Sequence, residues 1–586
     1  MMRERLGAWC LVGVLFVLIL GTGARGASEP VKNPDTFVTL RYGDPESLDP
    51  AWAYDTASTE VVYPNVYETL IGYDGTVLSR YVPMLATEVP TLANHLVSAD
   101  GLTYTFPIRK GVKFHDGTTM TPEDVRYSML RFMLQDRDGG PSWLLLTPLL
   151  GKASTRDAAG KVVVTYEQAA KAVTVQGDNV VFRLAHPYGA FLSIMAAWSF
   201  VLPKAWAAAH GDWAGSPATW QKYNNPKLQD RYAFDHMNGT GPFTLESWDR
   251  QSKQVLLARN SGYWRKPARL ARVVIRDVAE FTTRRLTLQQ GDADLIQVDR
   301  SDQSKVAGLP GVKIEDNLPT LVLQVLQFNW KIDPTGNPDV GSGKLDGNGI
   351  PPDFFSDVHV RRAFAYAFDY ATFIRDAYRG KAIQPNGPII QGLLGYNPAA
   401  PTFTFDVAKA AQEFKEAWGG KLWDTGFKFT LTYNTGNSAR QIASEIIKDK
   451  VQAINPKFKI DVRNIQWSTF LGATRAHKGT LYALGWAVDY PDPDDFAAPF
   501  MDSRGTYPPQ NSYSNPEADK LVKEGAETTD PAKRKAIYDQ LTKVSSNDVP
   551  YIYEAQPTGF EVMRSWVHGW YYNAVIIQDY YPLYKQ

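Results

Sequence analysis

The chain downstream of residue 30 alternates between short apolar runs and longer amphipathic stretches. Apolar side chains at every second position predict strands, at residues 37–42, 254–258, 272–275, 427–433, 458–462 and 550–553. Apolar side chains three or four positions apart predict helices, at residues 61–70, 284–289, 357–378, 406–418 and 438–454, with another beginning at Asp530-Pro531. Strands and helices alternate most regularly after residue 357, and this alternation is typical of an α/β fold.

One further segment predicts a hairpin followed by a helix. Apolar residues alternate over 104–108, Lys110-Gly111 turns the chain, and residues 112–114 would form the second arm. The run Thr121-Pro122-Glu123-Asp124 then supplies a capping hydroxyl, a proline at the first helical position and acids in the first turn. A helix is therefore expected to follow residue 121.

The most unusual segment covers residues 481–496. A nearly continuous apolar run ends in Gly485-Trp486 and predicts a buried strand, which Pro491 and Pro493 prevent from continuing. This strand delivers one carboxylate, Asp489, beside aromatic rings. Burying an unpaired carboxylate is costly, so Asp489 is expected either to be hydrated or to have a partner. The ammonium group of a ligand is one such partner.

Three further acids follow Asp489 closely, namely Asp492, Asp494 and Asp495. With Asp489 they could form a carboxylate dyad or bind a metal. No histidine stands among them and prolines separate them, so a solvated acidic turn is the preferred interpretation.

The amino-terminal 26 residues differ from the rest of the chain. Arg3 and Arg5 precede the apolar run 8–20, and small residues follow up to Gly26. This order predicts a secretory signal peptide cleaved after Gly26, because the 13 residues of the run are fewer than the roughly 20 that a spanning helix needs. The single cysteine, Cys10, lies in this run. The exported chain is thus expected to be periplasmic or otherwise extracytoplasmic, without disulfide or lipid anchor.

Composition and charge exclude several functions. Among 586 residues, 62 basic side chains balance 62 acidic ones, and no basic run indicates a nucleic-acid partner. The glycine-rich segment 239–243 completes neither GxGxxG nor GxxxxGK(S/T), which argues against phosphate binding. Neither GxSxG nor HExxH is present. We therefore expect neither an enzyme nor a cofactor.

Residues 329–355 are rich in Gly, Asp, Asn and Pro and form a long loop for a compact domain. Its Asp and Asn side chains could surround a calcium ion, but their spacing does not follow the calcium-binding loop of twelve residues. A solvated surface insertion is the preferred interpretation, and ion binding stays open.

Five blocks of residues together resemble a known family. In chain order they are Gly101–Phe106 with Lys113–Gly117 and Glu123–Val125, Gly239–Phe243 with Trp248, Asp357–Asp369, Gly485–Pro493, and Tyr513-Ser514-Asn515-Pro516. Each alone is weakly specific. Their order after a signal peptide resembles, along almost the whole exported chain, the extracytoplasmic solute-binding proteins of ABC importers, specifically the peptide- and nickel-binding family.

The resemblance implies an α/β, periplasmic-binding-protein-like bilobal fold with an extra domain and a ligand cleft between the lobes. The expected division is a signal peptide (1–26), lobe I (27–72, 205–319 and 557–586), an extra domain (73–204) and lobe II (320–556). The implied function is to capture a solute in the cleft and deliver it to a membrane permease. The protein is expected to act as a monomer, without a bound metal.

The resemblance also implies ligand-binding residues. In peptide-binding members the aspartate of a Gly-Trp-x-x-Asp block pairs with the ammonium group of the peptide, and Asp489 is the matching position. Trp486 would line the pocket, and the remaining candidates for ligand contact are Tyr54, Asp55, Trp467 and Tyr433. For each residue, a place in the core, a turn or a surface loop is the alternative.

One departure from the family concerns the other end of the ligand. Dipeptide-binding members place an arginine, which binds the carboxylate of the ligand, shortly before the helix that corresponds to residues 438–454. Residues 430–435 hold no arginine, and Arg440, inside the helix, is expected to be solvated. We therefore expect longer peptides or other solutes. Oligosaccharides, opines, metal chelates, or a sensory or chaperone role stay open as alternatives.

Overall fold

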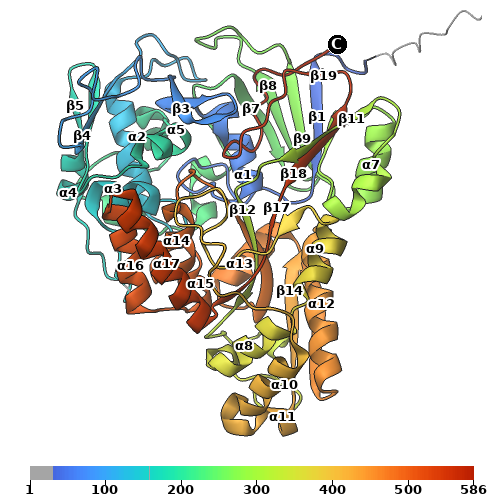
Figure 1. Cartoon of the computed structure of the whole chain (residues 1–586). Helices are drawn as coiled ribbons and strands as arrows, with labels where there is room; N and C mark the ends of the chain where they lie inside the picture. Colours follow the sequence, from blue (N-terminus) through green and yellow to red (C-terminus); the bar gives the residue numbers. More distant parts are fainter. Residues whose placement is uncertain (1–30, 158) are drawn as a thin grey trace, which may run out of the picture.

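The computed structural model describes residues 31–157 and 159–586, which form two lobes that lie one above the other in Figure 1. The expected signal peptide, with Cys10, lies outside the described residues. Within the described ranges, none of the helices has both the length and the hydropathy needed to span a membrane.

The upper lobe, lobe I, is built on a seven-stranded mixed sheet. In spatial order its strands are β11 (Val312–Leu318), β18 (Gly559–Arg564), β10 (Leu295–Ile296), β1 (Thr36–Arg41), β9 (Arg272–Asp277), β8 (Gln254–Arg259) and β7 (Phe243–Asp249). Strand β1 runs parallel to β9 and β10, whereas β18 arrives antiparallel from the far end of the chain. The predicted strands at 37–42, 254–258 and 272–275 are confirmed, as is a helix at 284–289, which is part of α7 (Phe281–Gln289).

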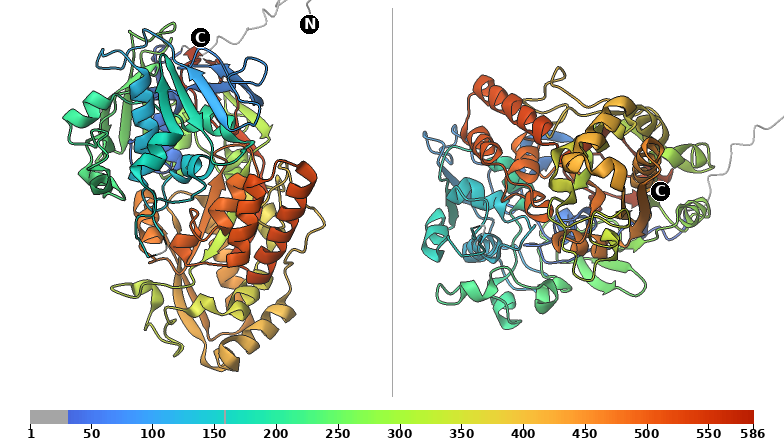
Figure 2. Two further views of the ribbon diagram at one scale, coloured as in Figure 1. Left: turned by 90° about the vertical axis from the view of Figure 1, so that its left-hand side faces the viewer. Right: turned by 90° about the horizontal axis from the view of Figure 1, so that it is seen from below.

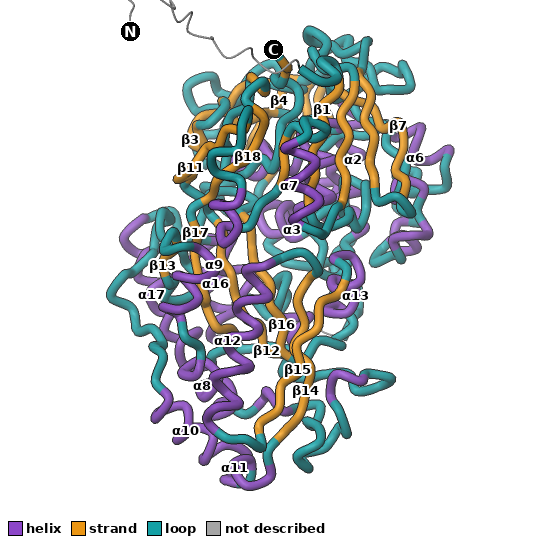
Figure 3. The backbone as a smooth tube through the Cα atoms, turned by 90° about the vertical axis from the view of Figure 1, so that its right-hand side faces the viewer, coloured by secondary structure: helices purple, strands orange, loops and turns teal. Residues whose placement is uncertain are grey.

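The lower lobe, lobe II, is built on a six-stranded sheet. Its order is β13 (Ala382–Ile383), β17 (Tyr551–Pro557), β12 (Val322–Phe328), β16 (Leu481–Ala487), β14 (Phe427–Asn434) and β15 (Phe458–Ile465). Strands β14 and β15 are parallel and joined through α12 (Ser438–Ile454), which confirms the predicted β-α-β unit. In Figure 3 the two sheets form separate groups of strands, one in each lobe.

Two short segments connect the sheets. Strand β11 of lobe I is followed by β12 of lobe II after residues 319–321, and β17 of lobe II is followed by β18 of lobe I after Thr558. The chain therefore crosses between the lobes in both directions at neighbouring positions, because β11 and β18 pair in one sheet and β12 and β17 pair in the other.

Helices cover the sheet of lobe II, and the orange and red ones lie below the blue and green part of the molecule in the left view of Figure 2. They are α8 (Val358–Ala367), α9 (Tyr370–Tyr378), α10 (Val407–Glu416), α11 (Leu422–Thr425), α12, α13 (Trp467–Arg475), α14 (Asp494–Met501), α15 (Pro508–Asn511), α16 (Pro516–Glu527) and α17 (Pro531–Asp548). The single helix predicted over 357–378 is wrong. Phe368 is extended and Asp369 caps α9, so the chain turns between α8 and α9.

A third group of elements packs beside lobe I. It contains a three-stranded sheet in the order β4 (Thr103–Pro107), β6 (Asn179–Arg183) and β5 (Val173–Gln176). Its helices are α2 (Pro122–Gln135), α3 (Trp143–Leu150), α4 (Tyr166–Ala172), α5 (Phe191–Trp198) and α6 (Lys204–Ala209). The predicted cap at Thr121 is confirmed, and the structure adds a reciprocal hydrogen bond from the backbone of Thr121 to the side chain of Asp124. The predicted hairpin is wrong, because β4 pairs with the distant β6 and residues 112–114 form no strand.

The first helix also differs from its prediction. Helix α1 (Thr56–Val61) begins earlier than residue 61 and is followed by a distorted turn, Val62–Val66, in which Tyr63 is extended. Pro64 has no N–H to donate, so a regular helix cannot continue through the turn. The remaining strands pair as two short ribbons, β2 (Ile71–Asp74) with β3 (Val77–Pro83) and β19 (Val567–His568) with β20 (Tyr584–Lys585).

Candidate ligand-binding site

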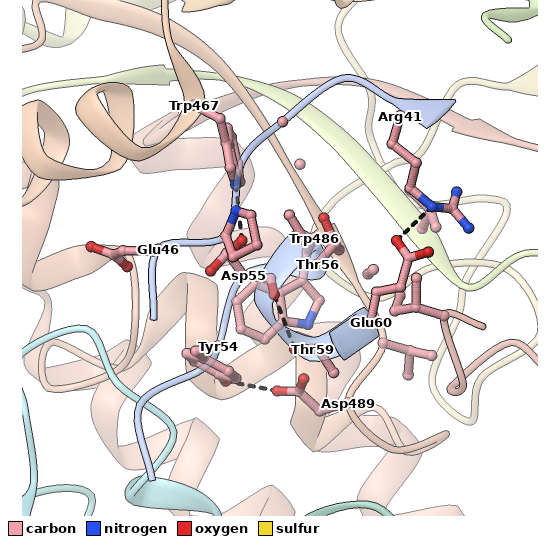
Figure 4. Close-up of a pocket in the computed structure, with 18 of the residues that line it drawn as sticks. Arg41, Glu46, Tyr54, Asp55, Thr56, Thr59, Glu60, Trp467, Trp486 and Asp489 are labelled. Atoms are coloured by element: carbon pink, nitrogen blue, oxygen red, sulfur yellow. Dashed lines mark hydrogen bonds and ion pairs between the residues drawn. The ribbon is translucent and has the colours of Figure 1, made fainter. Parts of the chain in front are cut away.

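A cavity of about 470 Å³ lies between the lobes. Lobe I lines it with the end of β1 and the segment 42–60, and lobe II lines it with α13, the start of α12 and residues 484–489. The volume falls within the range of about 300 to 1,000 Å³ of small-molecule sites. In Figure 4, Tyr54 of lobe I points toward Asp489 of lobe II, and Trp467 of lobe II points toward Asp55 of lobe I.

The structure brings five of the six expected ligand residues to this cavity: Tyr54, Asp55, Trp467, Trp486 and Asp489. Tyr433 is the exception, because its side chain belongs to the core of lobe II together with Phe429 and Leu431. Side chains alternate between the faces of a strand, so the residue of β14 that lines the cavity is Asn434. The expectation that Tyr433 contacts the ligand is therefore wrong, because neighbouring residues of β14 point to opposite faces of the sheet.

Asp489 lies two residues after β16 and is 8% exposed. Its Oδ2 accepts a hydrogen bond of 2.7 Å from the hydroxyl of Tyr54, which in turn accepts one of 2.9 Å from Nε1 of Trp143. Burial raises the pKa of Asp489 to about 8, and none of the described groups that act on this pKa is a cation. A buried carboxyl group thus lies in the cavity without a positive partner.

A second acid, Asp495, lies directly behind Asp489 and is fully buried. Its Oδ2 accepts hydrogen bonds from the backbone N–H of Asp489 at 2.8 Å and from Nε1 of Trp486 at 3.4 Å. Burial and the neighbouring Asp489 hold the pKa of Asp495 well above its usual range. Two adjacent buried carboxyl groups are unfavourable when both are ionised, so a proton between them is stable until a cation replaces it.

The expected solvated acidic turn is wrong. Asp494 is 1% exposed and accepts hydrogen bonds from the hydroxyls of Tyr188 and, at 2.9 Å, Tyr490. Burial raises the pKa of Asp494 to about 6. Asp492 forms a two-point ion pair with Arg534 at 2.5 and 2.9 Å. The turn is covered because α17 and the segment around Tyr188 pack against it.

Asp55 offers another carboxylate to the cavity. It caps α1, and its Oδ1 accepts hydrogen bonds of 3.1 Å from the N–H of Ser58 and of 3.1 Å from Nε1 of Trp467. Its Oδ2 is buried without a hydrogen-bond partner, and burial raises the pKa of Asp55. Because Trp467 belongs to lobe II, this contact also joins the lobes.

Aromatic rings line the cavity beside these acids. The ring of Tyr54 meets Trp486 edge-on at 5.7 Å and Trp198 at 5.3 Å, and Tyr507 meets Trp486 at 5.5 Å. The negative faces of such rings attract a cation. The acids therefore lie in an environment that favours an ammonium group over an anion.

Arg440 contradicts the expectation that it is solvated. It lines the cavity, is 9% exposed, and donates a hydrogen bond of 2.7 Å to Asn434, with its guanidinium 5.6 Å from the ring centroid of Trp467. The start of α12 lies against lobe I, where the N–H of Ser438 donates to Asp299 at 2.5 Å. The lobes therefore cover a position that would be exposed on an isolated helix.

Sequence reasoning missed the other arginines of the cavity, Arg41, Arg137 and Arg475. They lie in three distant segments, and none belongs to a recognisable motif. A signal was available only for Arg475, because Trp467, Leu471 and Arg475 are spaced by four on α13 and face the cavity together.

One group of described residues could hold a metal ion, namely His359, Glu413 and Glu416 on α8 and α10. Nδ1 of His359 already lies 2.7 Å from Glu413, and none of the three lines the cavity. In this pairing the group acts as a contact between two helices of lobe II.

Two acids of the 329–355 loop form ion pairs with the rest of lobe II. Asp333 pairs with Lys478 at 2.5 Å, and Asp339 pairs with Arg463 at 2.6 Å. These ion pairs attach the loop to the rest of lobe II.

The fold and the cavity together define a bilobal solute-binding protein. Residues 80–508 match the model of bacterial extracellular solute-binding proteins, family 5, and the chain belongs to this family. The predicted bilobal fold and the family resemblance are thereby confirmed.

Relatives of known name match along nearly the whole chain. The chain is 27% identical over 579 residues to the "Probable D,D-dipeptide-binding periplasmic protein DdpA" of Escherichia coli, with 96% of each chain covered. It is 25% identical over 543 residues to heme-binding protein A of Haemophilus influenzae, which covers 92% of this chain and 90% of that protein. Both relatives are named for binding.

A solved structure supports the same fold. The periplasmic binding protein DppA of Helicobacter pylori, in complex with the peptide STSA, matches with a TM-score of 0.73 at 22% identity. The match covers 94% of this chain and 98% of that one.

Proposed function

We propose that the protein acts as the solute-binding component of an ABC importer outside the cytoplasm, as a monomer. It captures short peptides, or other small solutes with a free amino group, in the cavity between the lobes. It then delivers them to a membrane permease. Its role is binding and delivery rather than catalysis.

The observation that carries this proposal is that the buried carboxyl group of Asp489 lacks a cationic partner among the described residues. The carboxyl group is buried in the cavity, receives a hydrogen bond from Tyr54, and has no cationic partner among the described residues. A charge-assisted hydrogen bond contributes about 1.5 to 3 kcal/mol net. A ligand ammonium group would therefore be bound tightly at this point and would replace the proton held there.

The surrounding groups suit the same ligand. An ammonium group has three N–H donors, and Asp55 has a buried oxygen, Oδ2, without a partner. The rings of Tyr54 and Trp486 supply apolar surface beside both acids. These groups recognise the amino end of a peptide without contacting its side chains, which supports a broad range of cargo.

The volume of the cavity, about 470 Å³, favours short ligands. Trp467 and Arg475, at the ends of α13, are separated by roughly 12 Å at 1.5 Å per residue. An extended peptide of about three residues covers that distance. The two relatives named for D,D-dipeptide and heme show that family members carry different cargo, so the proposal rests on the chemistry of the cavity.

Calorimetry with one pair of ligands tests the proposal. Ala-Ala-Ala is expected to bind, whereas acetyl-Ala-Ala-Ala, which lacks the positive charge, is expected to bind at least tenfold more weakly, about 1.4 kcal/mol. Equal binding of both peptides, or binding of neither, would contradict the proposed role. Mass spectrometry of small molecules that co-purify with the protein from its native source identifies the cargo directly.

A further inference from the structure

Two guanidinium groups share a single carboxylate in the wall of the cavity. Oε1 of Glu46 lies 3.2 Å from Nη2 of Arg137 and also contacts Nη2 of Arg475. The three side chains are 11%, 14% and 17% exposed, in the order Glu46, Arg137 and Arg475, and all three line the cavity. The cluster therefore carries a net positive charge where little water reaches it.

Two other cations of the cavity wall have carboxylate partners, whereas Arg440 donates a hydrogen bond to the neutral side chain of Asn434. Arg41 pairs with Glu60 at 2.5 Å, and Lys253 pairs with Asp277 at 3.2 Å. Asp138, next to Arg137 in the chain, pairs instead with Arg156 at 2.7 Å. Among the described residues, Glu46 is therefore the carboxylate that lies within ion-pair distance of both Arg137 and Arg475.

The cluster joins three separate parts of the fold. Glu46 lies in the segment after β1 of lobe I, Arg137 follows α2 beside lobe I, and Arg475 ends α13 of lobe II. The turn after Arg137 packs closely, because a Cβ on Gly139 would lie 3.1 Å from Nε2 of Gln510 and 3.4 Å from Cδ of Arg475. This close packing fixes the two guanidinium groups relative to each other when the lobes are together.

The surplus charge has a chemical consequence. Burial lowers the pKa of Arg137 and of Arg475 to about 10, so both remain charged at neutral pH. A partly buried charge without a partner is unfavourable. Guanidinium groups bind carboxylates through strong paired hydrogen bonds, so an anionic group of the ligand would neutralise the cluster.

We propose that a carboxylate of the ligand binds between Arg137 and Arg475, at the opposite end of α13 from Trp467. This inference rests on the proposed function and extends it, because it selects peptides that carry a carboxylate in addition to the ammonium group. The position differs from the arginine that dipeptide-binding members place before the helix corresponding to α12. The carboxylate is either the chain terminus or an acidic side chain.

Four peptides distinguish these two sources. They are Ala-Ala-Ala and Ala-Ala-Glu, each prepared with a free carboxyl terminus and as the terminal amide. If the terminus binds the cluster, amidation of Ala-Ala-Ala weakens binding at least tenfold. If the side chain binds it, amidation of Ala-Ala-Ala changes little, and Ala-Ala-Glu amide binds at least tenfold more tightly than Ala-Ala-Ala amide. Either pattern supports the inference and identifies the carboxylate.

Substitutions in the three cluster residues test whether the ligand carboxylate binds there. Arg475→Gln and Arg137→Gln are each expected to weaken the carboxylate ligand at least tenfold while changing the affinity for Ala-Ala-Ala amide by less than threefold. Glu46→Gln is the sharper variant, because it removes the competing carboxylate and is expected to strengthen binding of the carboxylate ligand. A purely structural role for Glu46 predicts weaker binding instead. Arg463→Gln, at an ion pair outside the cavity, serves as the matched control.

Two results would overturn the inference. One is binding that depends on the amino group but is insensitive to every carboxylate change in the peptides. The other is loss of carboxylate selectivity in Arg440→Gln together with its retention in Arg475→Gln and Arg137→Gln, which would assign the carboxylate to Arg440. Both results leave the proposed function intact. If no peptide of the panel binds, the proposed function fails and the inference fails with it.

Discussion

The hydroxyl of Tyr54 donates a hydrogen bond of 2.7 Å to Oδ2 of Asp489, across 435 positions of the chain and across the gap between the lobes. The tyrosine follows β1 of lobe I, and the aspartate follows β16 of lobe II. Each lobe therefore supplies half of the proposed amine-binding site, so lobe position and ligand binding are physically linked.

Asp489→Asn is expected to weaken Ala-Ala-Ala at least tenfold, about 1.4 kcal/mol, because the amide retains the shape of the side chain and loses the negative charge. Calorimetry measures the change. Asp461→Asn, an exposed residue of β15 that pairs with Lys428, should leave the affinity within experimental error. Unchanged affinity in Asp489→Asn would remove this residue from the site.

Peptide affinity is expected to rise as the pH increases from 6 to about 7.5. The ammonium group binds the ionised form of Asp489, whose pKa burial raises to about 8 in the free protein, so a proton must leave when the ligand binds. Tyr54 and Asp495 face this carboxyl group directly, and Tyr507 lies close enough to feel its charge. Calorimetry in buffers of different ionisation heat should detect proton release, and Asp489→Asn should abolish it.

The ligand-free protein is expected to lose stability as the pH increases from 5 to 9. The folded pKa of Asp489, about 8, is above the value of about 3.9 for an unfolded aspartate. The contribution of Asp489 to the free energy of unfolding is therefore complete below about pH 4 and is lost as the pH rises through about 8. Burial also raises the pKa of Glu554 to about 8, so the contribution of Glu554 to stability is lost over the same pH range. Urea unfolding at several pH values checks this, and Asp489→Asn should show a shallower dependence.

Asp49→Asn is expected to lower the free energy of unfolding by about 3 to 5 kcal/mol, the usual cost of removing one partner of a buried ion pair. The guanidinium of Arg131 is fully buried, with hydrogen bonds of 2.7 and 2.5 Å to Asp49 and an ion pair of 2.6 Å to Asp212. Urea denaturation measures the loss. The exposed pair Arg80 and Asp74 provides the control, since Asp74→Asn should cost about 0 to 1 kcal/mol.

Ligand binding is expected to bring the lobes together. The structure has contacts between them around the cavity, including Trp467 with Asp55 at 3.1 Å and Ser468 with Asp44 at 2.7 Å. Small-angle scattering should show a smaller radius of gyration with saturating Ala-Ala-Ala than without it. An identical profile, with binding verified by calorimetry in the same sample, would count against closure.

Much of the local structure could be predicted from the sequence. The strands at 37–42 and 427–433 and the helix at 438–454 follow from the spacing of apolar residues, because that spacing decides which face is buried. The cap at Thr121 follows from side-chain chemistry within four residues. Where the partner of a segment is distant, as for β4 and β6, the local pattern led to the wrong hairpin.

The residues of the candidate site likewise include some that the sequence identifies and some that it does not. Asp489 could be identified because an apolar strand, aromatic residues and prolines surround it in the sequence itself. Tyr433 was misplaced because Asn434, one position later on β14, lines the cavity. The pairing of Arg137 with Arg475 could not be predicted, since the two residues become neighbours only when the ends of α2 and α13 meet at Glu46.

The sequence by itself therefore determined the family, most elements and one buried acid, since these depend on residues close together in the chain. Only the tertiary structure decided which charges share the cavity and which are neutralised. The charge of Asp492 is balanced by Arg534. Asp489, in contrast, retains a proton, and the pair Arg137 and Arg475 retains a net positive charge. Burial and distance between charges govern their energies, and both are set by segments that are remote in sequence.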